Sequence, residues 1–288
     1  MSEFRESGRT IPAPSGGWAS SSALLAELTT EELRTLIDAG RAVALVPVGS
    51  TEPHGPHLPL ATDVILSDEA CLRAVRTLRE RSTPAVVTPA VSYGVTRYAR
   101  GFHGAIGVRE ETLIAFLADI ARALLDDGFA HVAFVNNHLE PEHIEAIDRA
   151  VQEVADERGP TCISFPNQLS KRWGRTLTDE FKRGNCHAGQ YETSLVLAAR
   201  EELVRREVLI ELPTLPISLS DAIKAHGGKD VTFREIGMER AYTGAPSTAS
   251  REEGDATYQR LAEMIVTEVE ERLAEDGDNT ARGDIPKL

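Results

Sequence analysis

Short apolar runs that alternate with longer amphipathic segments are the feature that most constrains the fold of this chain. Four apolar runs predict buried strands, at residues 42–48, 85–91, 131–135 and 161–165. The segments with helical periodicity are 23–39, 64–80, 110–127, 144–158, 190–205 and 255–274. Strands that alternate with helices in this way predict an α/β fold, with a mostly parallel sheet covered on both faces.

Length, charge and cysteine content bound the class of protein. The 288 residues carry a formal net charge of -14, which argues against nucleic acid as a partner because phosphate binding needs a basic face. No apolar run has membrane-spanning length, and three widely spaced cysteines predict a reducing cytoplasm without structural disulfides. We expect a flexible tail at 1–22, one domain at 23–275 and a polar tail at 276–288.

Potential metal ligands follow two of the predicted strands. Glu52, His54 and Asp63 lie in a loop rich in Gly and Pro after the first strand, and His138 and Glu140 follow the strand that ends at residue 135. The carboxyl ends of parallel strands meet at one edge of a sheet, where open α/β folds place their sites. We therefore expect these side chains to converge despite their separation in sequence.

The spacing of these residues suits a pair of metal ions. Glu52-x-His54 and His138-x-Glu140 repeat one spacing, which can place ligands on two metals about 3.5–4 Å apart. Asp63 has two oxygens and could bridge them, and imidazole with carboxylate ligands suits zinc or manganese. A simpler alternative is that Asp63 only caps the helix predicted from residue 64.

A third polar segment begins the helix predicted at residue 190. It reads His187-Ala-Gly-Gln190-Tyr-Glu192-Thr-Ser194. Cys186 beside His187 could act as a thiol nucleophile, but catalytic Cys–His pairs are usually distant in sequence. Arg97 and Arg100, in the loop after the second strand, could meet an anionic substrate or could be solvated surface residues.

The motifs together resemble the signature of the creatininase (creatinine amidohydrolase) family. The similarity covers roughly residues 40–275 and includes Pro47-Val-Gly-Ser-Thr-Glu-Pro-His-Gly-Pro-His through Asp63, Tyr93-Gly, Phe102-His-Gly, Asn136-x-His, His187-Ala-Gly-x-x-Glu-Thr-Ser and Ser247-Thr-Ala-Ser-Arg-Glu-Glu-Gly. The resemblance implies a three-layer α/β/α sandwich with two zinc or manganese ions, hydrolysis of amide-type C–N bonds, and a homo-oligomer, usually a hexamer.

The resemblance also implies roles for individual residues. Glu52, Asp63 and His138 would hold one metal, and His54, Asp63 and Glu140 would hold the other, with Asp63 as the bridge. His187 matches a substrate-side histidine, and we expect His187 and Glu140 to be catalytic. The expected substrate-binding residues are Leu139, Tyr93, Arg97 and Gln190.

Departures from the family pattern bear on the substrate. Many members have Asn-Gly-His-Gly-Gly-Asn where this chain has Asn136-Asn-His-Leu-Glu-Pro, and they take a carboxylate at the position of Gln190. Here Glu140 supplies the carboxylate instead. Leu139 replaces an aromatic wall, so creatinine is expected to be a poor substrate.

These features predict a cytoplasmic amidohydrolase that acts on a small polar amide, cyclic amide or formamide. Two alternatives remain open from the sequence: a peptidase or ring hydrolase on the same centre, and a metal-binding protein without catalysis.

Overall fold

A parallel four-stranded sheet forms the centre of the part of the chain that the computed structural model describes, residues 17–226 and 231–283. Its strands are β1 (Val43–Val48), β2 (Ala85–Val87), β3 (His131–Asn136) and β4 (Ile163–Ser164), in the order β2-β1-β3-β4. The register pairs Val43 with His131 and Val48 with Asn136, so β1 and β3 end at the same level. The predicted parallel sheet is confirmed.

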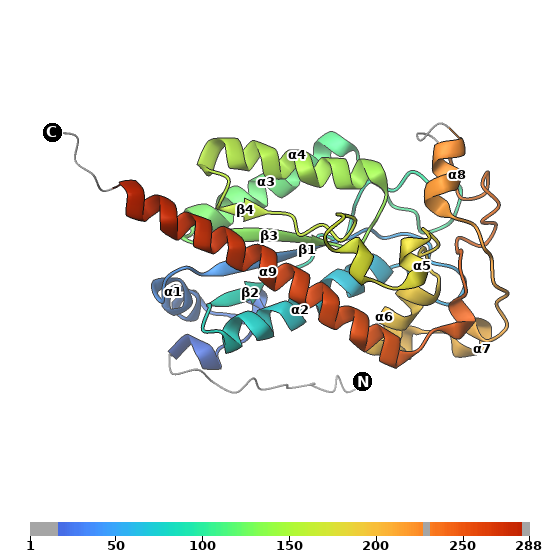
Figure 1. Ribbon diagram of the computed structural model, residues 1–288, viewed down its shortest axis with the longest axis horizontal. Coiled ribbons are helices and arrows are strands. Elements are labelled where there is room, and N and C mark those ends of the chain that lie inside the picture. Colours follow the sequence, from blue (N-terminus) through green and yellow to red (C-terminus); the bar gives the residue numbers. More distant parts are fainter. Residues whose placement is uncertain (1–16, 227–230, 284–288) are drawn as a thin grey trace.

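Helices cover both faces of this sheet, as Figure 1 shows. On one face, α2 (Thr62–Glu80), α6 (Gln190–Arg200) and the long α9 (Arg251–Gly283) pack against one another. On the other face, α3 (Glu110–Asp126) and α4 (Pro141–Arg158) pack side by side, with α1 (Thr30–Asp38) beside them. The architecture is therefore a three-layer α/β/α sandwich.

Alternating strand residues divide the core between the two faces. Val43 and Leu45 of β1 point to the cluster that includes α2, α6 and α9, whereas Ala44 and Val46 point to the cluster that includes α3 and α4. Every residue of β1 is buried, because helices occupy both sides. This explains why the strand is an uninterrupted apolar run.

Several predicted boundaries differ from the structure for identifiable reasons. The helix expected at 23–39 begins only at Thr30, because Thr29 is its N-cap and forms a capping box with Glu32; the short helix η2 (Leu25–Glu27) precedes it. Strand β2 ends at Val87, two residues before Pro89, which has no N–H to donate to a ladder.

The structure describes part of each segment that the sequence predicts to be a tail. Most of the predicted tail at 1–22 lies outside the described residues, but its last part includes the short helix η1 (Gly17–Ser20), in which Ala19 is buried. At the other end, α9 continues to Gly283, into the segment expected to be a polar tail.

Short helices that precede and follow α6 in the sequence gather beyond one end of the sheet. Figure 1 shows α5 (Asp179–Lys182), α7 (Arg206–Leu209) and α8 (Leu219–Ala225) near α6 at this end. The other short helices are η3 (Gly174–Thr176), η4 (Glu201–Leu203) and η5 (Pro246–Thr248). A small apolar cluster there includes Tyr98, Val231, Phe233 and Met238. Among the described helices, none is both long and apolar enough to span a bilayer.

Candidate metal centre and active site

The expected ligands converge where β1 and β3 end. Glu52 and His54 lie in the loop after β1, His138 follows β3, and Asp63 lies in the first turn of α2. All four are buried, with side chains at most 4% exposed. Ala61, not Asp63, occupies the N-cap position of α2 and makes no side-chain capping bond, so helix capping does not explain Asp63.

Asp63 directs its two oxygens at two different histidines. Its Oδ1 lies 3.0 Å from Nε2 of His54, and its Oδ2 lies 3.0 Å from Nδ1 of His138. Glu52 lies on the His138 side, with its Oε1 3.4 Å from the same Nδ1. An aspartate between two imidazoles has the arrangement that a bridging ligand needs.

Backbone carbonyls fix the tautomers of three histidines. Nδ1 of His54 lies 3.1 Å from the carbonyl oxygen of Glu52, Nε2 of His138 lies 2.7 Å from that of Val95, and Nε2 of His187 lies 3.1 Å from that of Pro53. A carbonyl oxygen can only accept, so each of these nitrogens carries the proton. In the neutral rings the other nitrogens present lone pairs, as in metal-binding histidines.

These lone pairs face carboxylates, which leaves a place for cations. Nε2 of His54 and Oδ2 of Asp63 are buried atoms without a hydrogen-bond partner among the described residues. Two lone-pair donors in contact repel one another unless a cation or proton lies between them. The donors are imidazole nitrogens and carboxylate oxygens, which are suitable ligands for zinc or manganese.

Glu192 joins this cluster, a role that the sequence analysis did not assign to it. Its Oε2 lies 3.5 Å from Nε2 of His54 and accepts a 2.6 Å hydrogen bond from the backbone N–H of Ala188. The sequence signal was present, because Glu192 follows His187 by five residues at the start of α6.

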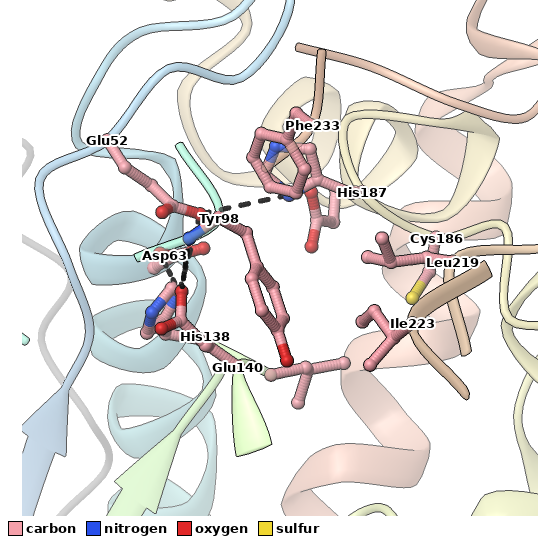
Figure 2. Close-up of a pocket in the computed structure, with 12 residues that line it drawn as sticks. Glu52, Asp63, Tyr98, His138, Glu140, Cys186, His187, Leu219, Ile223 and Phe233 are labelled. Carbon is pink, nitrogen blue, oxygen red and sulfur yellow. Dashed lines mark hydrogen bonds and ion pairs between the residues drawn. The ribbon is translucent and has the colours of Figure 1, made fainter. Parts of the chain in front are cut away.

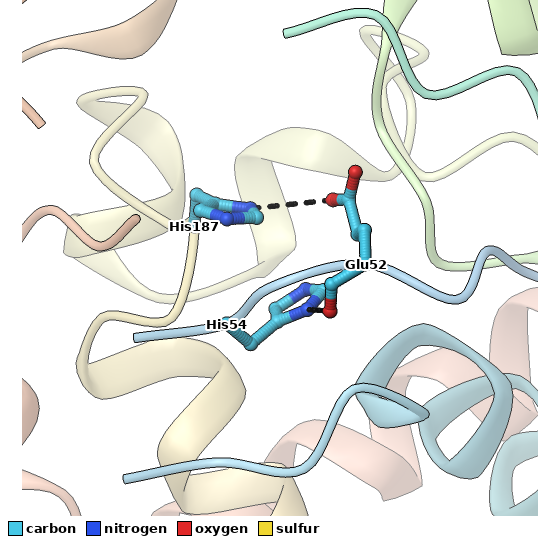
Figure 3. Close-up of side chains that lie close together, drawn as sticks. All are labelled: Glu52, His54 and His187. Atoms are coloured by element: carbon cyan, nitrogen blue, oxygen red, sulfur yellow. Dashed lines mark hydrogen bonds and ion pairs between the residues drawn. The ribbon is translucent and has the colours of Figure 1, made fainter. Parts of the chain in front are cut away.

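Three groups of potential metal ligands result within the described residues. Each group offers three donor atoms within 4.8 Å of one another, and the groups are Glu52–Asp63–His138, His54–Asp63–Glu192 and Glu52–His54–His187. His187 contributes to the third group with Nδ1, 3.8 Å from Oε1 of Glu52, and Figure 3 shows this pair beside His54.

The pKa values reflect the concentration of buried charge. Burial opposes the charged form of His54, but attraction from Asp63 outweighs it and raises the pKa to about 10. Burial raises the pKa of Glu192 to about 8. Burial and the neighbouring His54 lower the pKa of His187 to about 4, so this imidazole is neutral at pH 7. The cluster thus favours additional positive charge, which divalent cations would supply.

Glu140 lies near this cluster but outside its three ligand groups. Both of its oxygens lie 2.8 Å from the backbone nitrogen of Arg97, and Oε2 also accepts a 3.2 Å bond from that of Tyr98. Burial raises its pKa to about 7. Figure 2 shows Glu140 beside His138 at the edge of the pocket, so its carboxyl group can reach a bound substrate.

Of the four residues predicted to bind substrate, only Leu139 lines the pocket. Tyr93 is 52% exposed and does not line it. The Arg97 guanidinium donates to Glu110, and Gln190 donates through Nε2 to Glu253 at 2.5 Å. Neither side chain points its polar end into the pocket.

Two further residues near the candidate centre have different structural roles. His57 bonds through Nε2 to Oγ1 of Thr193 at 2.9 Å, which links the first loop to α6. Cys186 lines the pocket, but burial raises the pKa of its thiol, which opposes the thiolate that a nucleophile requires.

Glu180 holds the segment that carries His187 and Glu192, and sequence reasoning missed it. Its buried carboxylate accepts backbone bonds from Tyr191 at 2.7 Å and from Ala245 at 2.8 Å. Gly244 has φ +80°, and a Cβ there would collide with this carboxylate. One buried acid therefore ties the start of α6 to the strand-like segment before η5.

Comparison with known proteins decides the family. The family model described as creatinine amidohydrolase matches residues 26–269. The chain belongs to the creatininase family. The resemblance found in the sequence motifs is thereby confirmed, and the chain is a metal-dependent hydrolase.

Individual proteins of known description are similar over most of the chain. The mycofactocin precursor peptide peptidase of Mycolicibacterium smegmatis is 29% identical over 262 residues, which cover 89% of this chain and 90% of that protein. The creatinine amidohydrolase of Pseudomonas putida is 26% identical over 277 residues, 88% of this chain and 98% of the relative. A crystal structure of creatininase has a TM-score of 0.70 at 24% identity, covering 87% of this chain and 97% of the other, which confirms the fold.

Proposed function

We propose that this protein hydrolyses a C–N amide bond of a small amide or short peptide at a centre of two divalent ions. Glu52, Asp63 and His138 would hold one ion, and His54, Asp63 and Glu192 the other. The observation that carries the proposal is the pair of Asp63 oxygens, each 3.0 Å from a different imidazole. Solved structures with this fold include a manganese form and a zinc–zinc form of creatininase.

The distances within the cluster support these ligand sets. An ion about 2.1 Å from each donor in a tetrahedron separates neighbouring donors by about 3.4 Å. The His54 nitrogen lies 3.0 and 3.5 Å from the oxygens of Asp63 and Glu192, which is close to that spacing. When bound, such ions polarise a carbonyl group and lower the pKa of water.

Two groups beside the cluster can move protons. His187 is neutral and presents the lone pair of Nδ1, so it can accept a proton and pass it to a leaving nitrogen. Glu140 has a pKa of about 7, near the value that general acid–base catalysis uses best at neutral pH. The two groups border one pocket, so a single substrate can contact both.

The names of two relatives support a substrate with an amide-type bond. One similar protein is described as a precursor peptide peptidase and another as a creatinine amidohydrolase, and both names denote cleavage at such a bond. Creatinine itself should be a slow substrate, because Leu139 offers no aromatic face to its flat ring. We also retain a cytoplasmic homo-oligomer, a hexamer, as part of the proposal.

A metal count combined with a substrate screen tests this proposal. We expect two zinc or manganese ions per chain and turnover of at least one compound in a panel of lactams, formamides and short peptides. Asp63→Ala should lose most of both ions and all turnover, whereas Asp119→Ala, at an exposed position on α3, should retain both. Full metal occupancy in Asp63→Ala would refute the bridging assignment.

A further inference from the structure

The wall of the pocket opposite the ligand cluster is apolar. Figure 2 shows Glu52, Asp63 and His138 on one side of the pocket and Cys186, Leu219 and Ile223 across from them. The cavity volume of the pocket is only about 40 Å³, and the pocket opens to solvent at its mouth. A group that enters this narrow space must lie against the wall.

Two further side chains complete this wall and connect it to the ligand cluster. The Phe233 ring lies 4.4 Å from the His187 ring, centroid to centroid, at an interplanar angle of 37°. The backbone N–H of Phe233 donates a 2.7 Å hydrogen bond to the carbonyl oxygen of Tyr98, and both side chains line the pocket. A group that reaches His187 therefore also meets an aromatic surface.

The helix that supplies Leu219 and Ile223 is anchored on the same apolar cluster. Both residues pack against the cluster that contains Tyr98 and Phe233, yet both remain half-buried. Both side chains also line the pocket, so a bound group can contact them there. We name Tyr98, Cys186, Leu219, Ile223 and Phe233 the apolar wall.

Charge disfavours an anionic group at this wall. No lysine or arginine lines the pocket within the described ranges, whereas Glu52, Asp63, Glu140 and Glu192 all do. Arg97, which the sequence predicted to bind substrate, donates to Glu110 and lies 3.9 Å from Glu142. A carboxylate at the apolar wall would be desolvated without a counter-ion there.

We propose that the apolar wall is a binding subsite for an uncharged aliphatic or aromatic substrate group next to the scissile bond. The placement next to the scissile bond rests on the proposed hydrolysis, but the subsite itself does not. Leu219 and Ile223 are its specificity-determining residues, because they lie across the pocket from the ligand cluster and retain accessible surface.

Hydroxamates of varied acyl group test this subsite by binding alone. A hydroxamate chelates divalent ions, so acetohydroxamate, isovalerohydroxamate, phenylacetohydroxamate and succinic monohydroxamate share one anchor and differ in the group beyond it. In calorimetric titrations of the zinc-loaded protein, the isovaleryl and phenylacetyl compounds should bind at least tenfold more tightly than the acetyl compound. The succinyl compound should bind no more tightly than the acetyl compound.

Variants of the wall identify the residues responsible. Ile223→Asn and Leu219→Asn should each reduce the isovaleryl advantage roughly tenfold and leave acetohydroxamate affinity unchanged. Ile210→Asn is the matched control, since Ile210 is 74% exposed and outside the pocket. Ile223→Ala gives a second, milder truncation if the asparagine variant folds poorly, and it should reduce the advantage in the same direction.

The outcomes separate this inference from the proposed hydrolysis. Equal affinity for all four hydroxamates, or an unchanged isovaleryl advantage in folded Ile223 and Leu219 variants, would overturn the apolar subsite. The expected affinity pattern without turnover of any matching amide would contradict the hydrolysis and still support the subsite. Turnover of amides with no preference for an apolar group on either side of the scissile bond would contradict the subsite alone.

Discussion

Replacing Glu192 by glutamine should remove one of two bound ions, because its Oε2 lies with His54 and Asp63 around one candidate position. Glutamine keeps the shape of the side chain but loses the charge. Mutation of a residue that only hydrogen-bonds to a metal ligand lowers metal affinity by about 10–100-fold. Loss of a carboxylate ligand itself should therefore lower metal affinity by at least about 100-fold. The other group, Glu52–Asp63–His138, remains complete in this variant.

The same substitution should stabilise the metal-free protein. The pKa of Glu192 is about 8 in the folded chain against an ordinary value of 4.5, so the folded state holds a proton that the unfolded state has released. This lowers folding stability progressively as the pH rises from 4.5 to about 8. At pH 7, which is 2.5 pH units above the ordinary pKa, the loss of folding stability is on the order of 3 kcal/mol. Glutamine has no proton to release and avoids this cost.

Two measurements check these opposite effects. Elemental analysis after dialysis at fixed free zinc should find two ions in the wild type and one in Glu192→Gln, and urea unfolding of chelator-treated protein at pH 7 should show the variant to be more stable. Glu253→Gln is the matched control. Glu253, on α9, accepts a hydrogen bond from Gln190 on α6, the helix that carries Glu192, but it belongs to none of the ligand groups. Two tightly bound ions in Glu192→Gln, or a less stable metal-free variant, would refute this reasoning.

Three other predictions follow from single residues. His187→Gln should lower kcat by roughly 100-fold and retain both metals, as steady-state kinetics and elemental analysis can check; loss of metal would make His187 a ligand instead. Glu180→Ala leaves the buried N–H groups of Tyr191 and Ala245 unpaired and should cost about 2–5 kcal/mol in urea unfolding; an unchanged midpoint would contradict its anchoring role. Burial lowers the pKa of His131 from 6.5 to about 4, so stability should fall by up to about 3 kcal/mol as the pH drops through this window, and a stability–pH curve of His131→Gln should be flatter.

The fold was predictable because the strands and helices of its core have simple patterns of apolar residues in the sequence. β1 and β3 are apolar throughout since helices cover both faces, and the amphipathic segments that became α2, α3 and α4 were recognisable by their spacing. Local chemistry moved the boundaries: Thr29 starts α1 later than the periodicity suggested. The region after α6 was not predictable, because its short helices are stabilised by contacts with distant loops such as that of Tyr98.

The candidate site was predictable as far as strand topology places residues together. His54, Asp63 and His138 meet because β1 and β3 are neighbours, a relation that the alternation of strands and helices already implied. Tyr98 and Phe233, which give the pocket its aromatic surface, come from loops whose path depends on tertiary packing. No local pattern in the sequence marks them.

The sequence alone does not decide whether Glu140 or Glu192 lies beside His54 and Asp63. Both are glutamates near a histidine of the site, and both lie at the start of a helix. The structure separates them through the backbone: the N–H groups of Arg97 and Tyr98 donate to the Glu140 carboxylate, whereas the turn at Ala188, with φ 49°, directs Glu192 toward His54. A non-glycine residue in that conformation is strained, and such strain is common where a fold must position functional groups. The ligand role proposed for Glu192 thus depends on a turn whose geometry only the folded chain reveals.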